Sequence, residues 1–332
     1  MQKKKIVCVG EALIDRIRNK SNSRFTDFLG GAPANVACAL SKLKIDSIFI
    51  GCLGTDHFGE RFISKFNDLD VNLDLLQLDK NSSTRVVNVD RDKFGDRFFT
   101  GFESSPHPCF ADEVLSKKII EKELSTLEKF FLETKYLVLG TISLSSPIVK
   151  DTIFFLLDQA NKFEVKIIID LNWREVFWDN SSFASEISKI ARIDLIKKFL
   201  NNAHVLKLAK EEATLFFEHE NPSLISQQLS KSPDVIITDG KNPVSWYINR
   251  LQGNTEIPVS QNIIDTTGAG DAFLAGFISK IISSGYPSNK LEVEDCVRFA
   301  IVCGLLTCLG EGAIERQPDY EKVNKFLGSL IS

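Results

Sequence analysis

Short apolar runs alternate with amphipathic segments along most of the chain, and this alternation restricts the fold more than any other feature of the sequence. Residues 136–139 and 165–169 are apolar runs of strand length, and residues 149–163 between them have helical spacing. The same alternation continues in segments 204–208, 210–217, 235–238 and 271–284. Strands that alternate with helices indicate a mainly parallel sheet covered by helices on both faces. The sequence therefore predicts an α/β fold.

Turn-forming or acidic residues stand where several of these predicted strands end. Gly10, Gly140, Asp170 and the pair Asp239-Gly240 each follow an apolar run. The carboxyl ends of parallel strands share one edge of a sheet, and ligands of such sheets bind beyond that edge. We therefore expect the functional site to lie there.

The amino-terminal third fits the same fold except in one segment. Residues 6–9 and 47–50 predict strands, residues 58–69 predict a helix, and Pro33 stands near the start of another helix that includes Val36 and Leu40. Residues 84–102 instead alternate polar and apolar positions around Gly95, which predicts an antiparallel hairpin. Towards the carboxyl end, residues 244–248 are expected to begin a second hairpin and residues 292–309 to form a long helix.

Composition and charge exclude several classes of protein. The formal net charge of −4 argues against nucleic-acid binding, which requires a basic face. No segment approaches the roughly 18 consecutive apolar residues of a membrane-spanning helix. We therefore expect a soluble, cytoplasmic protein with neither a membrane nor a nucleic acid as partner. The seven cysteines are irregularly spaced without a CxxC pair, and predict reduced, mostly buried thiols rather than a zinc site.

The segment 265–271 combines two features that phosphoryl chemistry needs. We expect residues 263–264 to enter it as a strand and a helix to begin near Asp271, with Gly268 and Gly270 in the turn between them. The main-chain N–H groups of such a turn and the positive end of the helix attract anions. A carboxylate at the start of the helix could accept the proton of an attacking hydroxyl.

Two other interpretations of this segment stay open on the residues alone. Asp271 could merely cap the helix. Gly268-Ala269-Gly270 could also begin a dinucleotide-binding loop, although Phe273 occupies the place of the third glycine and the turn comes late in the chain. A P-loop NTPase is excluded at the level of the motif, because no GxxxxGK[ST] sequence occurs.

Two long motifs resemble the signatures of the PfkB, or ribokinase-like, carbohydrate kinases, and within that family the fructokinases most closely. One is DTTGAGDAF at 265–273, and the other is GGAPANVA at 30–37 followed by GCLGTD at 51–56 and Gly59. Further fructokinase-like segments are GEALID at 10–15, TRV at 84–86, DLNWR at 170–174 with Trp178, ITDG at 237–240, CG at 303–304 and GEGAI at 310–314.

The resemblance covers nearly the whole chain. It implies one kinase domain over residues 1–332 with a three-layer α/β/α fold, a mainly parallel central sheet and a small β-sheet lid. The lid would be formed by segments at about residues 14–30 and 84–110. A homodimer through this lid is a further expectation from the family. The lid departs from the usual fructokinase pattern in the polar stretch NVDRDK at 88–93. Phe98, Phe99 and Phe102 could cover a sugar, contact a second copy, or belong to the core.

The resemblance also implies roles for the residues that match its motifs. Asp271 would be the catalytic base, and the main chain of Gly268, Ala269 and Gly270 would receive the transferred phosphoryl group. The residues that would bind the sugar are Asp15, Gly30, Gly31, Asn35 and Arg174. Asn35 could alternatively cap a helix, and Arg174 could be part of a surface ion pair. The residues that would surround the nucleotide are Thr238, Asp239, Gly240, Thr267, Cys303, Gly304 and Gly312.

The implied cofactors are ATP and Mg²⁺, with K⁺ or another monovalent cation beside Asp265 and Thr267 as an option. Family members carry an Asn-x-x-Glu-like motif that helps to hold the magnesium. Glu212 keeps the acid of this motif, but Ala209 stands where Asn or Ser is usual. We therefore expect Glu212 to act on the metal only indirectly, through water.

The function that follows is transfer of the γ-phosphoryl group of ATP to a hydroxymethyl of a free sugar, with D-fructose at O6 preferred. Ribose, 2-keto-3-deoxygluconate and adenosine are alternative acceptors. A phosphorylated sugar is less favoured, although Arg85 and Arg174 keep it open. A sugar or nucleotide sensor that lacks catalysis is a further alternative, disfavoured because Asp271 and both glycines are present.

Overall fold

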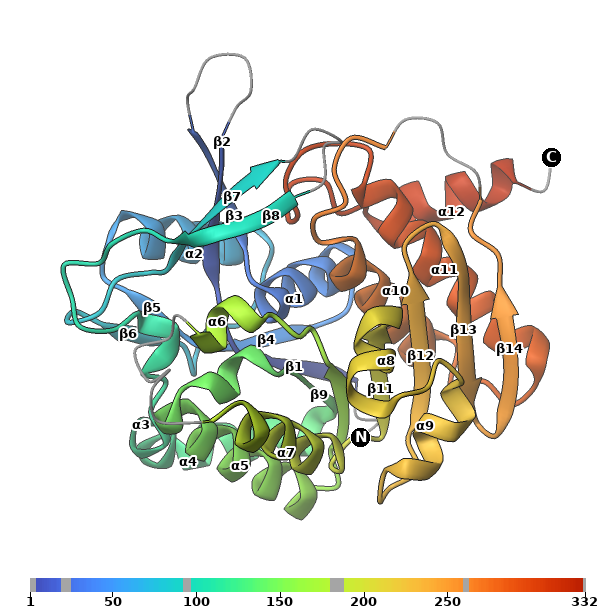
Figure 1. Cartoon of the computed structure of the whole chain (residues 1–332), viewed down its shortest axis with the longest axis horizontal. Helices are drawn as coiled ribbons and strands as arrows, with labels where there is room; N and C mark the ends of the chain where they lie inside the picture. Colours follow the sequence, from blue (N-terminus) through green and yellow to red (C-terminus); the bar gives the residue numbers. More distant parts are fainter. Residues whose placement is uncertain (1–3, 19–24, 92–96, 180–187, 259–262, 331–332) are drawn as a thin grey trace.

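The structure, a computed structural model, describes residues 4–18, 25–91, 97–179, 188–258 and 263–330 (Figure 1). Its largest sheet has eight strands in the order β14-β13-β12-β11-β10-β9-β1-β4. The strands are β1 Lys5–Val9, β4 Ser47–Ile50, β9 Thr134–Gly140, β10 Lys166–Asp170, β11 Val205–Ala209, β12 Asp234–Asp239, β13 Asn242–Ile248 and β14 Leu251–Thr255. The six strands from β4 to β12 are parallel, and β13 and β14 form antiparallel pairs at the edge. The predicted α/β fold is confirmed.

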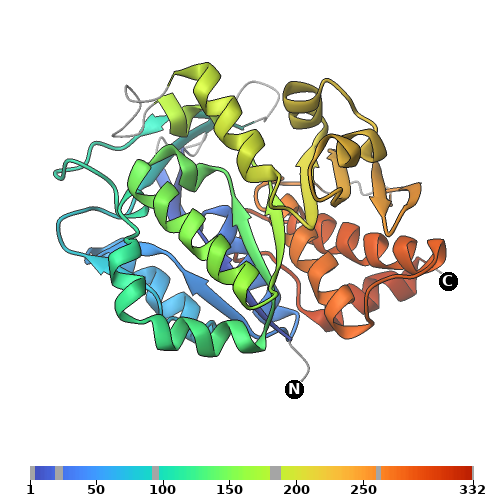
Figure 2. The same ribbon diagram turned by 90° about the horizontal axis from the view of Figure 1, so that it is seen from below.

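Each parallel strand contributes side chains to both faces of the sheet, as the continuous apolar runs predict. In β1, Ile6 and Cys8 belong to one core cluster, and Val7 and Val9 belong to another. The first cluster packs against α1 Ala32–Lys42, α2 His57–Asp68, α10 Ala269–Ser283, α11 Lys290–Thr307 and α12 Tyr320–Ser329. The second packs against α4 Leu124–Glu133, α5 Pro147–Lys162, α7 Lys189–Leu200, α8 Lys210–Phe217 and α9 Pro222–Gln228 (Figure 2). The molecule therefore has three layers, α/β/α.

A second sheet forms the lid and stands apart from the large sheet in Figure 1. Its strands, in the order β3-β2-β7-β8, are β2 Leu13–Arg18, β3 Phe25–Gly30, β7 Val86–Arg91 and β8 Arg97–Phe102. β2 and β7 run parallel, and the two outer pairs are antiparallel. The hairpin predicted for residues 84–102 is thus confirmed, and its Gly95 turn lies outside the described residues. A separate pair consists of β5 Cys52–Gly54 and β6 Gln77–Asp79.

Residues 263–264 do not form the strand that their apolar character predicts. Ile263 and Ile264 are 46% and 56% exposed and belong to no strand. Two hydrogen bonds hold the segment against the end of α11, because the main-chain N–H groups of Ile264 and Asp265 both donate to the carbonyl oxygen of Cys308. The prediction was wrong because two consecutive apolar residues do not specify the hydrogen-bond partners of their main chain.

The carboxyl-terminal segment returns to α1, so that residues from opposite ends of the sequence lie together. Gln317 Nε2 donates to the carbonyl oxygen of Asn35 at 2.8 Å. Lys42 Nζ donates to the carbonyl oxygens of Ile314 and Gln317. No helix among the described residues is both long enough and apolar enough to cross a membrane.

Candidate active site

α10 begins at a glycine turn that lies beside the polar cavity described below. Gly268 is the residue before the helix and has a φ of 73°, a left-handed conformation that favours glycine. A Cβ atom on Gly268 would lie 2.5 Å from Cβ of Ala313. The helix begins at Ala269, and no side chain caps it. The main-chain N–H of Ala269 donates to the carbonyl oxygen of Thr266 at 3.2 Å, and among the described residues those of Gly268 and Gly270 have no such partner. These two N–H groups and the positive helix end form a suitable cradle for an anion.

Asp271 lies within the first turn of α10 and does not cap it. Its Oδ2 atom accepts a hydrogen bond from Asn35 Nδ2 at 2.7 Å. Asn35 comes from the first turn of α1, whose start at Gly31 likewise has no side-chain cap. The two residues that the sequence left open as helix caps are therefore paired with each other, across 236 positions of the chain.

The surroundings of Asp271 favour a proton acceptor that works near neutral pH. Burial, with a further contribution from the charge of Asp170, raises the pKa of Asp271 to about 6. The hydrogen bond from Asn35 and the charges of Lys207 and Arg174 act in the opposite direction and limit the rise. A carboxylate with a pKa in this range is ionised at pH 7 and is still a stronger base than an exposed aspartate.

Asp271 faces a cavity of about 510 Å³ between the carboxyl edge of the large sheet and the lid. The lid contributes Leu13, Asp15 and Val89. The residues from the sheet edge, from α1, from α6 Glu175–Asp179, and from the turn and first residues of α10 are Glu11, Gly31, Ala32, Asn35, Ile142, Asn172, Arg174, Phe177, Lys207, Thr266, Thr267, Gly268, Gly270 and Asp271. Of the expected sugar-binding residues, Asp15, Gly31, Asn35 and Arg174 are thus brought together.

The remaining expected sugar residue, Gly30, shapes this cavity without lining it. A Cβ atom on Gly30 would lie 2.6 Å from Asp15 Oδ2, so that only glycine leaves the carboxylate its place. Gly31 has a φ of 96°, and a Cβ atom there would lie 2.6 Å from the carbonyl oxygen of Glu11. The glycine pair therefore lets the lid strand β3 turn into α1 directly beside Asp15.

Two ionisable residues of this cavity were not anticipated from the sequence. Glu11 is buried, with Oε1 accepting a hydrogen bond from the main-chain N–H of Ala32 at 3.2 Å. Burial raises the pKa of Glu11 to about 8. Lys207 lies in the middle of β11 and is also buried, and its Nζ donates to Asp170 Oδ1 at 3.1 Å and to Oδ2 at 2.9 Å. A lysine inside the apolar run VLKLA was the signal that the sequence offered.

A second, more apolar cavity of about 680 Å³ lies on the other side of the glycine turn. Its lining residues are Thr238, Gly240, Lys241, Val244, Ile257, Pro258, Ile263, Thr266, Ala269, Gly270, Phe273, Ile301, Gly304, Leu305 and Cys308. Thr266 and Gly270 line both cavities. The anion cradle therefore stands at the junction between a polar cavity and an apolar one.

The expected nucleotide residues are only partly found on this second cavity. Thr238, Gly240 and Gly304 line it. Asp239 instead makes an ion pair with Lys210 at 3.3 Å. Cys303 is buried between helices, because a Cβ atom on Gly276 of α10 would lie 2.7 Å from its Sγ. Cys303 therefore packs between α10 and α11 and does not line the cavity.

Thr267 and Gly312 are joined through Asp265. The main-chain N–H of Thr267 donates to Asp265 Oδ1 at 3.0 Å, and that of Gly312 donates to Oδ2 at 3.1 Å. Thr267 lines the polar cavity rather than the apolar one. These two residues therefore connect the glycine turn to the segment after α11.

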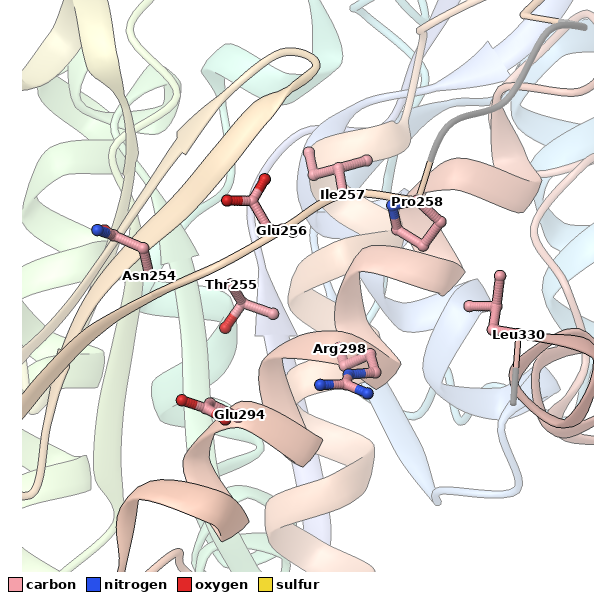
Figure 3. Close-up of a pocket in the computed structure, with 8 residues that line it drawn as sticks. All are labelled: Asn254, Thr255, Glu256, Ile257, Pro258, Glu294, Arg298 and Leu330. Atoms are coloured by element: carbon pink, nitrogen blue, oxygen red, sulfur yellow. The ribbon is translucent and has the colours of Figure 1, made fainter. Parts of the chain in front are cut away.

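A smaller surface hollow of about 330 Å³ adjoins the apolar cavity and shares Ile257 and Pro258 with it. Figure 3 shows that Glu256 and Glu294 stand at this hollow with Arg298 of α11. Two carboxylates against one guanidinium disfavour a polyphosphate there. A nucleotide in the apolar cavity would therefore direct its phosphates towards Gly270 and away from this hollow.

The residues fit a magnesium ion that would be held mainly by phosphate oxygens and water molecules rather than by protein side chains. Glu212 Oε2 accepts a hydrogen bond from the main-chain N–H of Ala209 at 2.7 Å, and Oε1 accepts one from that of Trp173 at 2.6 Å. Both oxygens are thus already engaged with the main chain. Within the described part of the chain, no group of three or more acidic, histidine or cysteine side chains is arranged to hold a metal ion.

Arg85 does not serve the alternative that the sequence left open for it, the binding of a second phosphate. Its side chain is 1% exposed and forms ion pairs with Asp112 at 2.9 Å and Glu113 at 3.2 Å. The guanidinium carbon lies 4.5 Å from the ring centroid of Phe102. Arg174 remains at the polar cavity, where its Nη1 donates to the carbonyl oxygen of Trp173 at 3.0 Å.

The fold and the site together define an α/β phosphotransferase architecture, in which a carboxylate base and an anion cradle separate two cavities. Comparison with known proteins agrees, since the model of the pfkB family carbohydrate kinases matches residues 3–319. The chain belongs to this family of carbohydrate kinases, and the dinucleotide-loop interpretation of Gly268 to Gly270 is thereby excluded.

The similar proteins include fructokinases from plants and bacteria. The chain is 30% identical over 335 residues to probable fructokinase-5 of Arabidopsis thaliana, covering 98% of this chain and 97% of that protein. It is 28% identical to the fructokinase of Salmonella typhimurium, covering 97% and 98%. The crystal structure of Vibrio cholerae O395 fructokinase with fructose, ADP and calcium ion has a TM-score of 0.80 at 25% identity and covers 98% of this chain and 99% of that chain. The Xylella fastidiosa fructokinase with bound ATP has a TM-score of 0.85 at 24% identity, over 99% and 100% of the two chains.

Proposed function

We propose that this carbohydrate kinase phosphorylates free D-fructose at O6 with ATP as the phosphoryl donor. The observation that carries the proposal is the Asp271–Asn35 pair, which lies beside the glycine turn where the two cavities meet. Similarity to fructokinases over nearly the full length of the chain supports fructose as the sugar. The solved relative with fructose and ADP bound supports the same pairing of ligands.

In the proposed reaction, the sugar occupies the polar cavity and adenosine occupies the apolar one. Asp271 accepts the proton of the O6 hydroxyl as O6 forms its bond to the γ-phosphorus of ATP. The bond between that phosphorus and the bridging oxygen breaks, and ADP leaves. The main-chain N–H groups of Gly268 and Gly270, with the positive end of α10, stabilise the negative charge on the transferring group, while that of Ala269 donates to Thr266 within the turn.

Asp15, Asn35, Arg174 and the main chain of Gly31 would bind the remaining oxygens of the sugar. A polyol buried without partners for its hydroxyls binds poorly, so each of these groups contributes to selection. The lid strand β2 carries Asp15 and would exclude water once the sugar is bound, which suppresses transfer to water. The domain comprises residues 1–332, with lid segments at about 14–30 and 84–110.

A magnesium ion would supply charge neutralisation at the phosphates, and Glu212 would act on it only through water. Two solved fructokinase structures contain a calcium ion and a potassium ion, which supports a divalent and a monovalent cation here, the latter beside Asp265. We further propose that the enzyme is cytoplasmic, in keeping with seven free cysteines, and that it forms a homodimer through the lid.

The test is an ADP-release assay with Mg·ATP over a panel of free sugars that includes fructose, ribose and 2-keto-3-deoxygluconate, with adenosine as a further acceptor. Asp271→Asn should lower kcat on the preferred sugar by roughly 10²- to 10⁴-fold while the sugar still binds, because a general base contributes about that much. Asp319→Asn is the matched control, since Asp319 caps α12 away from both cavities. Full turnover in the Asp271 variant would disprove the base, and no turnover on any acceptor would favour a sensor.

A further inference from the structure

A buried ammonium group lies directly against the anion cradle, and the reaction as derived above gives it no task. A Cβ atom placed on Gly270 would lie 2.8 Å from Lys207 Nζ. Lys207 is 7% exposed and lines the polar cavity together with Thr267, Gly268 and Asp271. The second glycine of the turn is therefore needed partly because the ammonium occupies the space of a side chain.

The hydrogen bonds of Lys207 leave part of its donor capacity for a ligand. An ammonium group has three N–H donors. Among the described residues, Nζ donates only to the two carboxylate oxygens of Asp170, at 3.1 and 2.9 Å. Asp170 ends β10, so the pair bridges two adjacent strands at the edge of the sheet where ligands bind.

The charges around Lys207 keep it protonated. Burial alone would disfavour the ammonium, but the carboxylates of Asp170, Asp271 and Glu212 together raise the pKa of Lys207 above its ordinary value. The charge of Lys207 therefore adds to that of the positive end of α10. Both attract the negative charge of an anion that binds at the glycine turn.

A purely structural ion pair explains this arrangement less well. Buried ion pairs contribute little to stability compared with well-packed apolar residues, because both charges lose their hydration. The neighbours Leu206 and Leu208 in β11 are apolar and fully buried. A lysine in this strand is thus costly for folding, and its position at the cavity points to a role in the reaction.

We propose that Lys207 is a catalytic residue, whose Nζ donates a hydrogen bond to a non-bridging oxygen of the phosphoryl group during its transfer, while Asp170 holds the ammonium in place. The inference rests on the proposed phosphotransferase reaction. Lys207 stays protonated throughout: the hydroxyl proton of the sugar goes to Asp271, the new bond joins the sugar oxygen to phosphorus, and ADP carries away the bridging oxygen. Lys207 thus interacts most strongly with the transition state.

The test compares Lys207→Met, Asp170→Asn and the double variant Lys207→Met/Asp170→Asn. Lys207→Met should lower kcat by roughly 10²- to 10³-fold, as the loss of one oxyanion donor does in other enzymes. The dissociation constants of ATP and sugar should change by less than about fivefold, because the contact forms mainly in the transition state. Lys207→Met leaves the carboxylate of Asp170 buried without its cation, which could destabilise the fold. The double variant removes that charge as well, and so separates an effect on folding from an effect on catalysis.

Binding of ADP with aluminium fluoride and sugar, which imitates the transferring phosphoryl group, gives a second readout. The wild type should bind this combination far more tightly than ADP and sugar alone, and both Lys207→Met variants should lose most of that advantage. If the double variant recovers stability but not kcat, Lys207 is catalytic. Recovery of kcat to within about tenfold of the wild type would reduce Lys207 to one half of a structural ion pair.

The two proposals can fail separately. A wild type that phosphorylates a sugar, together with an active double variant, overturns the role of Lys207 and leaves the proposed function intact. A wild type that transfers phosphoryl to no acceptor overturns both. Lys207→Arg is a further check, because it keeps the charge but enlarges the head group against Gly270. We expect it to be slower than the wild type and faster than Lys207→Met.

Discussion

At the scale of single residues, Asp271 acquires its properties from neighbours that come from three other elements. Burial raises the pKa of Asp271, and Asp170 at the end of β10 raises it further, whereas Asn35 of α1 and Lys207 of β11 favour the ionised form. The balance leaves Asp271 ionised above a pH of about 6. Because a base must be ionised to accept a proton, activity should decline as the pH falls through this value.

The effect of Asn35 on this balance gives a prediction with a definite sign. Asn35→Ala removes a hydrogen bond that stabilises the carboxylate, so the pKa of Asp271 should rise and the acid limb of the kcat/KM profile should move to higher pH. The measurement is kcat/KM for the sugar between pH 5 and 9, at fixed ionic strength.

Asn172→Gly is the control for this experiment. Asn172 also lines the polar cavity, and its φ of 41° suits glycine without strain. The acid limb of the kcat/KM profile of Asn172→Gly should stay near that of the wild type. An acid limb that stays in place or moves down in Asn35→Ala would contradict the assigned role of the Asn35–Asp271 hydrogen bond.

At the scale of elements, the lid is attached to the rest of the molecule through Arg85. Its side chain pairs with Asp112 and Glu113 of the 3-10 turn Ala111–Glu113, and it stacks on Phe102 at the end of β8. Phe177, which lines the sugar cavity, also lies near the guanidinium, at 5.3 Å. The carbonyl oxygen of Arg85 accepts a hydrogen bond from the main-chain N–H of Ile14, next to Asp15.

Arg85→Lys should therefore weaken sugar binding more than nucleotide binding. Lysine keeps the charge but cannot make the forked contacts or stack flat between rings. We expect the KM for the sugar to rise roughly tenfold, the KM for ATP to change by less than about threefold, and the midpoint of thermal unfolding to fall. Steady-state kinetics with each substrate varied in turn will measure this.

Arg16→Lys provides the matched control, because Arg16 pairs with Asp27 and Glu103 at a more exposed position of the same lid sheet. Exposed or part-exposed ion pairs contribute little, so both KM values should stay close to those of the wild type. Equal changes in the KM values of Arg85→Lys for sugar and for ATP would show that Arg85 acts on the whole site and not on the lid alone.

At the scale of the whole molecule, the two cavities meet at Thr266 and Gly270. An inhibitor that joins the sugar to adenosine through a chain of phosphates should therefore occupy both cavities at once. The second half then binds at a high effective concentration, and we expect an inhibition constant roughly 10²-fold below that of ADP. Competition against ATP and against sugar, each varied separately, will measure it.

The inhibitor should compete with both substrates. A joined compound that binds no better than ADP, or that competes with ATP alone, would contradict the assignment of the two cavities. Adenosine polyphosphates without the sugar are the control for the contribution of the added charge.

The sequence by itself determined the architecture of the large sheet and the position of its functional edge. Buried parallel strands must be apolar on both faces, so they stand out as continuous runs, and the turns that end them mark one edge. The glycine turn at 268–270 was also predictable, because it depends on residues that are adjacent in the chain. By contrast, the exposed pair Ile263 and Ile264 misled the prediction, since two apolar residues do not specify their partners.

Only the tertiary structure decided which of these residues act together. The Asn35–Asp271 hydrogen bond joins positions 236 residues apart. The ion pair of Lys207 with Asp170, the burial of Arg85, and the difference between Gly304 at the cavity and Cys303 between helices likewise depend on contacts between distant segments. Local sequence fixes the backbone preference of each residue, but burial and the charges of neighbours, which set the chemistry of a side chain, arise only when the chain has folded.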